Sequence, residues 1–131
     1  MSPLQVTKAF VDRINAGDAA GLAALMTDDH RFIDSLGNVV AGRETMKNGW
    51  VGYFKMVPGY HLAAEQWLFD GVVVVMLGTA SGGHCPEGAA ESIGNWSTPA
   101  ACRAVVRDEL VAEWRVYADN EPIRRLMRTT A

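Results

Sequence analysis

The stretch HRFID, residues 30–34, brings an acidic side chain to the end of a short alternating run. Successive side chains of a strand point to opposite sides, so His30, Phe32 and Asp34 share one face. Asp34 has two interpretations. Its carboxylate can accept N–H bonds from the turn at residues 36–38, as acidic residues do in turns. Alternatively, it lies at the edge of an apolar cavity, where desolvation raises its pKa and suits it to proton transfer.

Other side chains with usable chemistry accompany this strand. His30 is four residues from Asp34, roughly 13 Å along a strand, so the two cannot touch directly but can contact one ligand. We expect His30 at the entrance of the strand, exposed to solvent. Trp50 and Tyr53 are three residues apart in a helical stretch and therefore adjacent on its surface. Both can line a pocket wall, with the Tyr53 hydroxyl as a hydrogen-bond donor.

The last predicted hairpin decides where Arg103 points. A two-residue turn at 108–109 pairs Arg103 with Trp114 across the two strands. Trp114 and Val116 then share a face with Ala101 and Arg103. If this face lies inside, Arg103 needs an acid, a ligand or the Trp114 ring as its partner. If the register slips by one residue, Arg103 lies on the surface.

The sequence HCPE, residues 84–87, combines residue types that bind metals. It lacks the spaced ligand pairs of a zinc site, and the glycines around it are typical of a loop, so we expect no metal site. The chain also has no glycine-rich phosphate loop, no Ser-His-Asp order and no Cys-His nucleophile pair.

Composition excludes several classes of partner. The chain has 131 residues, the usual size of one domain, and a net charge of −3, which argues against nucleic acid and anionic membranes. The longest apolar run, VVVVML, is too short to span a bilayer, and the N-terminus lacks the pattern of a signal peptide. Cys85 and Cys102 are the only cysteines, which favours a reduced, cytoplasmic location.

Helices are expected in the first part of the chain. The pattern SPLQ at 2–5 is a capping box with proline at the first helical position. Val6, Phe10 and Ile14 then give one apolar stripe. A glycine ends this helix, and an aspartate caps a second one over AAGLAALM, residues 19–26.

A third helix is predicted over 43–56, ended by a proline and a glycine. Gly49 and Gly52 weaken it by about 1 kcal/mol each. We interpret them as allowing Trp50, Tyr53 or a neighbouring backbone to approach closely.

Strands dominate the second half. After a first strand at 30–34, the pattern predicts four more over 60–69, 71–82, 95–106 and 110–118. A glycine-rich loop at 82–94 and a short closing helix over EPIRRLM complete the chain. Helices followed by a meander of strands are typical of an α+β domain with an antiparallel sheet. We therefore expect a single domain over 1–131, with a curled sheet on three helices forming a cone open at one end.

This order resembles the nuclear-transport-factor-2-like superfamily, in particular its SnoaL-like and ketosteroid-isomerase-like branch. The matching stretches are INAGDAAGLAALMTDDHRFIDSLGN, AGRE and LVAEWRVYADN. The resemblance implies a cone-shaped α+β barrel with an interior pocket and a homodimer formed through the outer face of the sheet. In this sequence, Glu113, Arg115 and Tyr117 would belong to that outer face.

The resemblance also implies site residues. Asp34 matches the catalytic aspartate base of ketosteroid isomerase, whose oxyanion hole uses a tyrosine and a protonated aspartic acid. Phe10 and Ala101 stand at those two positions here, so steroid isomerisation by that arrangement is not expected. Limonene-epoxide hydrolase uses an Asp–Arg–Asp group, and the acid in its last strand matches Val116 here. The resemblance therefore does not supply this acid, and that catalytic group is incomplete as well.

Two functions remain open from the sequence. The first is a cofactor-independent isomerase, cyclase or hydrolase that acts on an apolar carbonyl compound, with Asp34 as its acid or base. The second is a binder of an apolar small molecule, or an accessory domain, without turnover. The residues expected to contact the ligand are Phe10, Ile14, His30, Phe32, Trp50, Tyr53, Ala101, Arg103, Trp114 and Val116.

Overall fold

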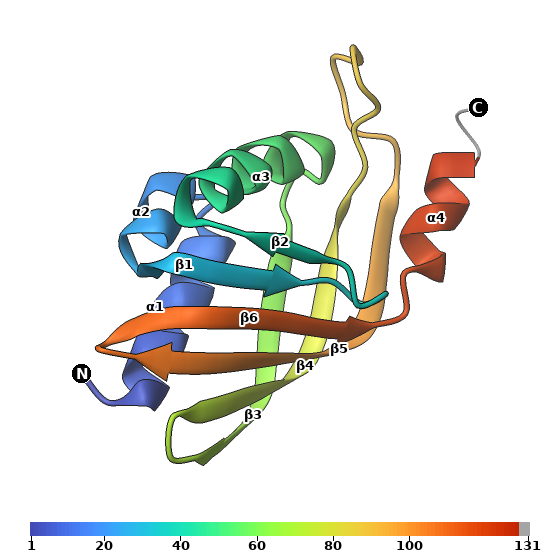
Figure 1. The fold of residues 1–131 in the computed structure, drawn as a ribbon. Helices are drawn as coiled ribbons and strands as arrows, with labels where there is room; N and C mark the ends of the chain where they lie inside the picture. The colour runs from blue at the N-terminus through green and yellow to red at the C-terminus, as the bar shows by residue number, and fades with distance from the viewer. Residues whose placement is uncertain (129–131) are drawn as a thin grey trace.

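The computed structural model describes residues 1–128 and has an α+β fold, as the sequence predicts. The helices are α1 (Pro3–Asn15), α2 (Ala19–Ala24), α3 (Arg43–Met56) and α4 (Glu121–Arg128). The strands are β1 (Met26–Ile33), β2 (Val39–Ala41), β3 (His61–Asp70), β4 (Val73–Gly83), β5 (Asn95–Arg107) and β6 (Leu110–Ala118). Figure 1 shows α1, α2 and α3 gathered on one side, with α4 apart beside β5.

One curved sheet holds all six strands, in the order β2-β1-β6-β5-β4-β3. Every neighbouring pair is antiparallel except β1 and β6, which run parallel. The short strand β2, which sequence patterning did not predict, pairs with β1 through Phe32 and Val40. Strand β1 also begins earlier than expected, at Met26.

Helix α1 forms as its sequence signals predict, whereas α2 ends at Ala24, before the predicted end, because Met26 already belongs to β1. The Ser2 hydroxyl accepts from the Gln5 N–H, and the Gln5 side chain accepts from the Ser2 N–H, which completes the capping box. Val6, Phe10 and Ile14 have no exposed surface. They pack the closed end of the cone against the inner face of the sheet.

A β-bulge in β6 sets the register of the last hairpin. The turn pairs Arg107 with Leu110 as predicted, but Ala112 is an extra residue, because Val106 pairs with Val111 and Val105 pairs with Glu113. From the bulge onward, the register shifts by one position. Trp114 therefore lies opposite Ala104.

This shift corrects the inward placement of Ala101 and Arg103. Both point to the outer face, where Ala101 pairs with Tyr117 and Arg103 with Arg115. Arg103 donates a hydrogen bond of 2.7 Å to the Glu113 carboxylate. Of the two registers that the sequence allowed, the slipped one is correct.

Two local devices shape the β3 side of the sheet. At Gly78, an added Cβ would lie 1.9 Å from the carbonyl oxygen of Ala63, so only glycine allows β4 to approach the irregular part of β3. The Asn15 side chain, at the end of α1, donates to the carbonyl of Leu62 at 3.0 Å and accepts from its N–H at 2.8 Å. This pair of bonds joins α1 to the edge strand β3.

Within residues 1–128, no helix is long and apolar enough to cross a membrane.

Candidate ligand-binding cavity

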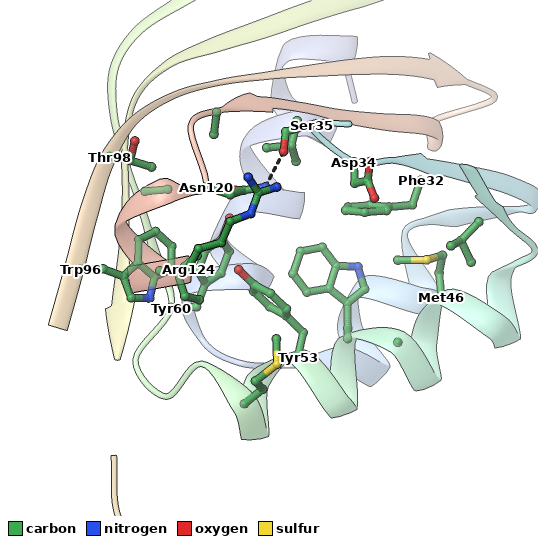
Figure 2. A pocket seen from close by; sticks show the side chains of 18 of the residues that line it. Phe32, Asp34, Ser35, Met46, Tyr53, Tyr60, Trp96, Thr98, Asn120 and Arg124 are labelled. Carbon is green, nitrogen blue, oxygen red and sulfur yellow. Dashed lines mark hydrogen bonds between the residues drawn. The ribbon is translucent and has the colours of Figure 1, made fainter. Parts of the chain in front are cut away.

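A cavity of about 520 Å³ occupies the open end of the cone. Figure 2 shows side chains from α3, the sheet and α4 converging on this space. Its lining comprises Phe32, Asp34, Ser35, Val40, Thr45, Met46, Gly49, Trp50, Tyr53, Met56, Tyr60, Ala80, Trp96, Thr98, Val116, Ala118, Asn120, Ile123, Arg124 and Met127. The size and the mostly apolar lining are those of small-molecule sites.

Aromatic rings build much of the cavity wall. Trp50 is 4% exposed and lies at the centre of a ring cluster. It meets Phe32 edge-on at 6.0 Å between centroids and Tyr53 edge-on at 5.9 Å. Tyr60 continues the cluster to Trp96, 6.2 Å away. Such a wall offers flat apolar surfaces to a ligand that itself contains rings.

Asp34 is both a turn carboxylate and a cavity residue. Its Oδ1 accepts from the N–H groups of Leu36 and Asn38, each at 2.9 Å, and its Oδ2 accepts from the Asn38 side chain at 3.1 Å. Burial acts to raise the pKa of Asp34, but the hydrogen bonds from Asn38, Leu36 and Gly37 outweigh it and hold the pKa below its usual value. On balance the pKa of Asp34 is therefore lowered, contrary to the cavity interpretation of the sequence.

The phenols of Tyr53 and Tyr60 have no hydrogen-bond partner among residues 1–128. Burial raises the pKa of Tyr53 to about 12. Burial also raises the pKa of Tyr60 well above its usual value, with Tyr53 and Cys102 acting in the same direction. Both hydroxyls stay protonated near neutral pH and remain available as donors.

The rim of the cavity joins two distant parts of the chain. Asn120, just before α4, donates a hydrogen bond of 2.6 Å from its side chain to the Ser35 hydroxyl in the turn after β1. Three residues of α4 line the cavity, namely Ile123, Arg124 and Met127. The closing helix expected from EPIRRLM is therefore confirmed, and it forms one wall.

Five residues that the sequence nominated line the cavity together: Phe32, Asp34, Trp50, Tyr53 and Val116. They come from β1 and the turn after it, from α3 and from β6. The alternation of β1 explains why Phe32 and Asp34 share this side.

Four other nominated residues lie in the core beneath the cavity and are not among its lining residues. Phe10, Ile14, His30 and Trp114 are fully or almost fully buried. The Phe10 ring lies 4.9 Å from Trp114 and 6.1 Å from His30 between centroids. Their packing fills the closed end of the cone, so a ligand meets only the residues above it.

The solvated placement of His30 was wrong. His30 has no exposed surface, and its Nδ1 lies 2.7 Å from the carbonyl oxygen of Val111. Because a carbonyl only accepts, Nδ1 carries the proton. Burial lowers the pKa of His30, against the opposing effect of the Val111 carbonyl, so the imidazole stays neutral.

Sequence reasoning missed several lining residues that had a usable signal. Trp96 and Thr98 lie two residues apart on β5, on the face that also carries the buried Ala100. The two arginines of β5, Arg103 and Arg107, must avoid the core and therefore mark its outer face. Alternation along the strand would then have placed Trp96 and Thr98 on the inner face. Arg124 and Met127 are three residues apart on a helix, so their side chains lie on one face. This spacing was the signal that could have identified Arg124.

No group of three or more potential metal ligands occurs within the described part of the chain. Cys102 is fully buried, and burial raises the pKa of its thiol to about 12, so it does not act as a thiolate.

Comparison with known proteins agrees with this architecture. The sequence profile of the SnoaL-like domain matches residues 7–119. Among solved structures, a proposed SnoaL-like polyketide cyclase from Shewanella denitrificans superposes with a TM-score of 0.84, at 14% identity over 97% of each chain. IdmH, a proposed polyketide cyclase from Streptomyces antibioticus, gives 0.78, at 18% identity over 97% of this chain and 99% of its own.

A protein with a ketosteroid isomerase-like fold from Catenulispora acidiphila, solved with trimethylamine, gives a TM-score of 0.72. Its identity is 19%, over 89% of this chain and 86% of that one. No curated protein matches the chain. At such identities, the structural likeness establishes the fold alone.

Proposed function

Because this chain belongs to the SnoaL-like domain family, we propose that its cavity binds an apolar, ring-containing carbonyl compound and promotes proton transfer on it. The reaction class is that of an isomerase or cyclase without a cofactor, and Asp34 is the base. Structural neighbours proposed as polyketide cyclases direct the choice of ligand toward aromatic compounds with several carbonyl groups.

The observation that carries this proposal is the composition of the cavity. Aromatic rings supply the walls, the Tyr53 and Tyr60 hydroxyls have no partner in residues 1–128, and one carboxylate lies at the rim. A carbonyl oxygen is the acceptor that such phenols lack. Donors aimed at this oxygen also stabilise the negative charge that develops on it when a neighbouring carbon loses a proton.

In the proposed step, the Asp34 carboxylate takes a proton from the carbon beside the carbonyl. The C–H bond breaks, its electron pair moves to the carbonyl oxygen as an enolate, and Asp34 becomes a carboxylic acid. The lowered pKa keeps Asp34 ionised at neutral pH, so it begins as a base and not as an acid. The free lone pairs of Oδ2, which accepts one bond from Asn38, are the site of protonation.

Hydrogen–deuterium exchange tests this step without knowledge of the natural substrate. The protein is incubated with 2-tetralone in heavy water, and NMR follows loss of the protons beside the carbonyl. We expect Asp34→Asn to slow the catalysed exchange by about a hundredfold or more. The amide oxygen of Asn can still accept both backbone N–H bonds at Oδ1, so the turn is preserved.

Two further variants sharpen the result. Asn38→Ala removes the side-chain donor from Oδ2, so the pKa of Asp34 rises and the acid limb of the pH profile moves to higher pH. Asp29→Asn changes an exposed carboxylate of β1 that pairs with Arg107, and it leaves exchange unchanged. Exchange that is equally fast in Asp34→Asn, with ligand still bound, contradicts Asp34 as the base.

The second candidate function is binding without turnover. It is favoured by the three hydrogen bonds that Asp34 accepts, because they give this carboxylate a structural role in the turn without any catalytic one. This candidate predicts tight binding of ring-containing ketones by calorimetry, no catalysed exchange, and the same affinity in Asp34→Asn.

A further inference from the structure

We propose that Arg124 of α4 binds a carboxylate on the ligand, so that the ligand has an apolar ring system inside the cavity and an anionic group at the rim. This inference rests on the proposed binding function and makes the class of ligand more specific.

The arginines of α4 are not equivalent. Arg125 and Arg128 both pair with Glu121, the only acidic residue of the helix. Arg124 makes no ion pair or side-chain hydrogen bond with any residue in 1–128, and it is the one arginine of α4 that lines the cavity. Figure 2 shows its side chain extending from α4 over the cavity, on the side where Tyr53 points inward.

The charged residues that line the cavity do not pair with each other. Among the lining residues within the described part of the chain, Arg124 is the only cationic one and Asp34 the only anionic one. They form no ion pair with each other, and the Asp34 oxygens accept hydrogen bonds from Leu36 and Asn38. At the rim, the guanidinium of Arg124 has no ion-pair partner within residues 1–128, and Glu121 acts on it only at longer range. It lies beside a space built for an apolar molecule.

A carboxylate fits this position better than a neutral group. Guanidinium presents paired N–H donors in a fork that matches the two oxygens of a carboxylate. Because Arg124 is exposed at the rim, water and salt weaken the interaction, and we expect a moderate preference and not an absolute requirement.

The experiment compares two probes that share one ring system. Anthraquinone-2-carboxylate carries the anion, and anthraquinone-2-carboxamide is its neutral match. Binding is followed by quenching of the fluorescence of Trp50 and Trp96, which both line the cavity. We expect the protein to prefer the carboxylate by about tenfold, with a preference that falls as salt is added.

Variants of the same helix assign this preference. Arg124→Gln abolishes the preference for the carboxylate and leaves carboxamide binding unchanged, whereas Arg124→Lys retains part of it. Arg125→Gln removes one positive charge from the same helix at a side chain paired with Glu121, and it keeps the preference.

Each outcome has a distinct meaning. If the two probes bind the unmodified protein equally, or if Arg125→Gln removes the preference as fully as Arg124→Gln, the assignment of Arg124 is overturned while binding in the cavity stands. If neither probe binds, the proposed binding function fails and this inference fails with it.

Discussion

The burial of His30 in the core requires its imidazole to be neutral. Its imidazole is fully buried against Phe10 and donates from Nδ1 to the Val111 carbonyl, while Nε2 has no partner among the described residues. The neutral ring can be accommodated there, but the imidazolium would have a buried charge without a counter-ion.

A pH dependence of stability follows from this burial. The pKa of His30 is lowered in the folded protein, so between the usual value of 6.5 and the lower folded value only the unfolded chain binds the proton. The contribution of the neutral His30 to the free energy of unfolding is fully present above pH 6.5. It falls as the pH drops below that value, by about 1.4 kcal/mol per pH unit at most. Urea unfolding at pH 7.5 and 5.5 measures this loss, and His30→Gln should reduce it. An equal loss in that variant would assign the dependence to other groups.

Asp34 illustrates how far single residues could be predicted from the sequence. The sequence offered its turn bonds and its place beside Phe32 at an apolar cavity as alternatives, and the structure has both. The direction of its pKa could not be predicted, because it depends on how three hydrogen bonds balance the burial of one carboxylate. That balance is a property of the folded turn.

At the scale of elements, strand limits were easier to predict than strand faces. The pattern of β6 gave Leu110–Ala118 correctly, yet one bulged residue, Ala112, reversed the faces assigned to Arg103 and Ala101. Period-two alternation carries no information on where an extra residue enters. The charge of Arg103 was the available signal, because an unpaired guanidinium avoids the core.

The glycines of α3 and β4 give opposite predictions. At Gly52, an added Cβ meets nothing within 4 Å, and at Gly49 it meets only Met46 at ordinary contact distance. No neighbouring backbone approaches either glycine closely, so that part of the interpretation is wrong. Gly52→Ala should stabilise the protein by about 1 kcal/mol, because alanine favours a helix. Gly78→Ala should destabilise it by about 2 kcal/mol or more, because its Cβ would collide with the Ala63 carbonyl.

Thermal and urea unfolding of these two variants measure both effects. Matched changes of the same sign in Gly52→Ala and Gly78→Ala would contradict the geometric argument, because both substitutions add the same methyl group.

At the scale of the molecule, the outer face of the sheet carries apolar residues that the domain alone does not cover. On β4, Val74 and Met76 are buried inside, while Val73, Val75 and Leu77 alternate to the outer face and stay partly exposed. Leu68 on β3 lies opposite Val75 on that face and is 47% exposed. A strand apolar on both faces is typical of a sheet covered on both sides. We therefore propose that a second copy packs on this face.

Light scattering after gel filtration tests the dimer. We expect a mass of about twice the 14.2 kDa of one chain. Val75→Lys places a charge at the centre of the face and should give a monomer, whereas Val51→Lys, on the exposed side of α3, should remain dimeric. A monomer for the unmodified protein at micromolar concentration would contradict the proposed interface.

The two bonds between Asn15 and Leu62 also bear on how the chain behaves in a crowded solution. β3 is an outermost strand of the sheet, and a bare edge of this kind recruits strands from other molecules and seeds fibrous aggregates. The Asn15 amide occupies both the N–H and the carbonyl that Leu62 would otherwise present. A helix terminus thus blocks one docking position for foreign strands, so the contact that joins α1 to β3 also opposes strand addition at this edge.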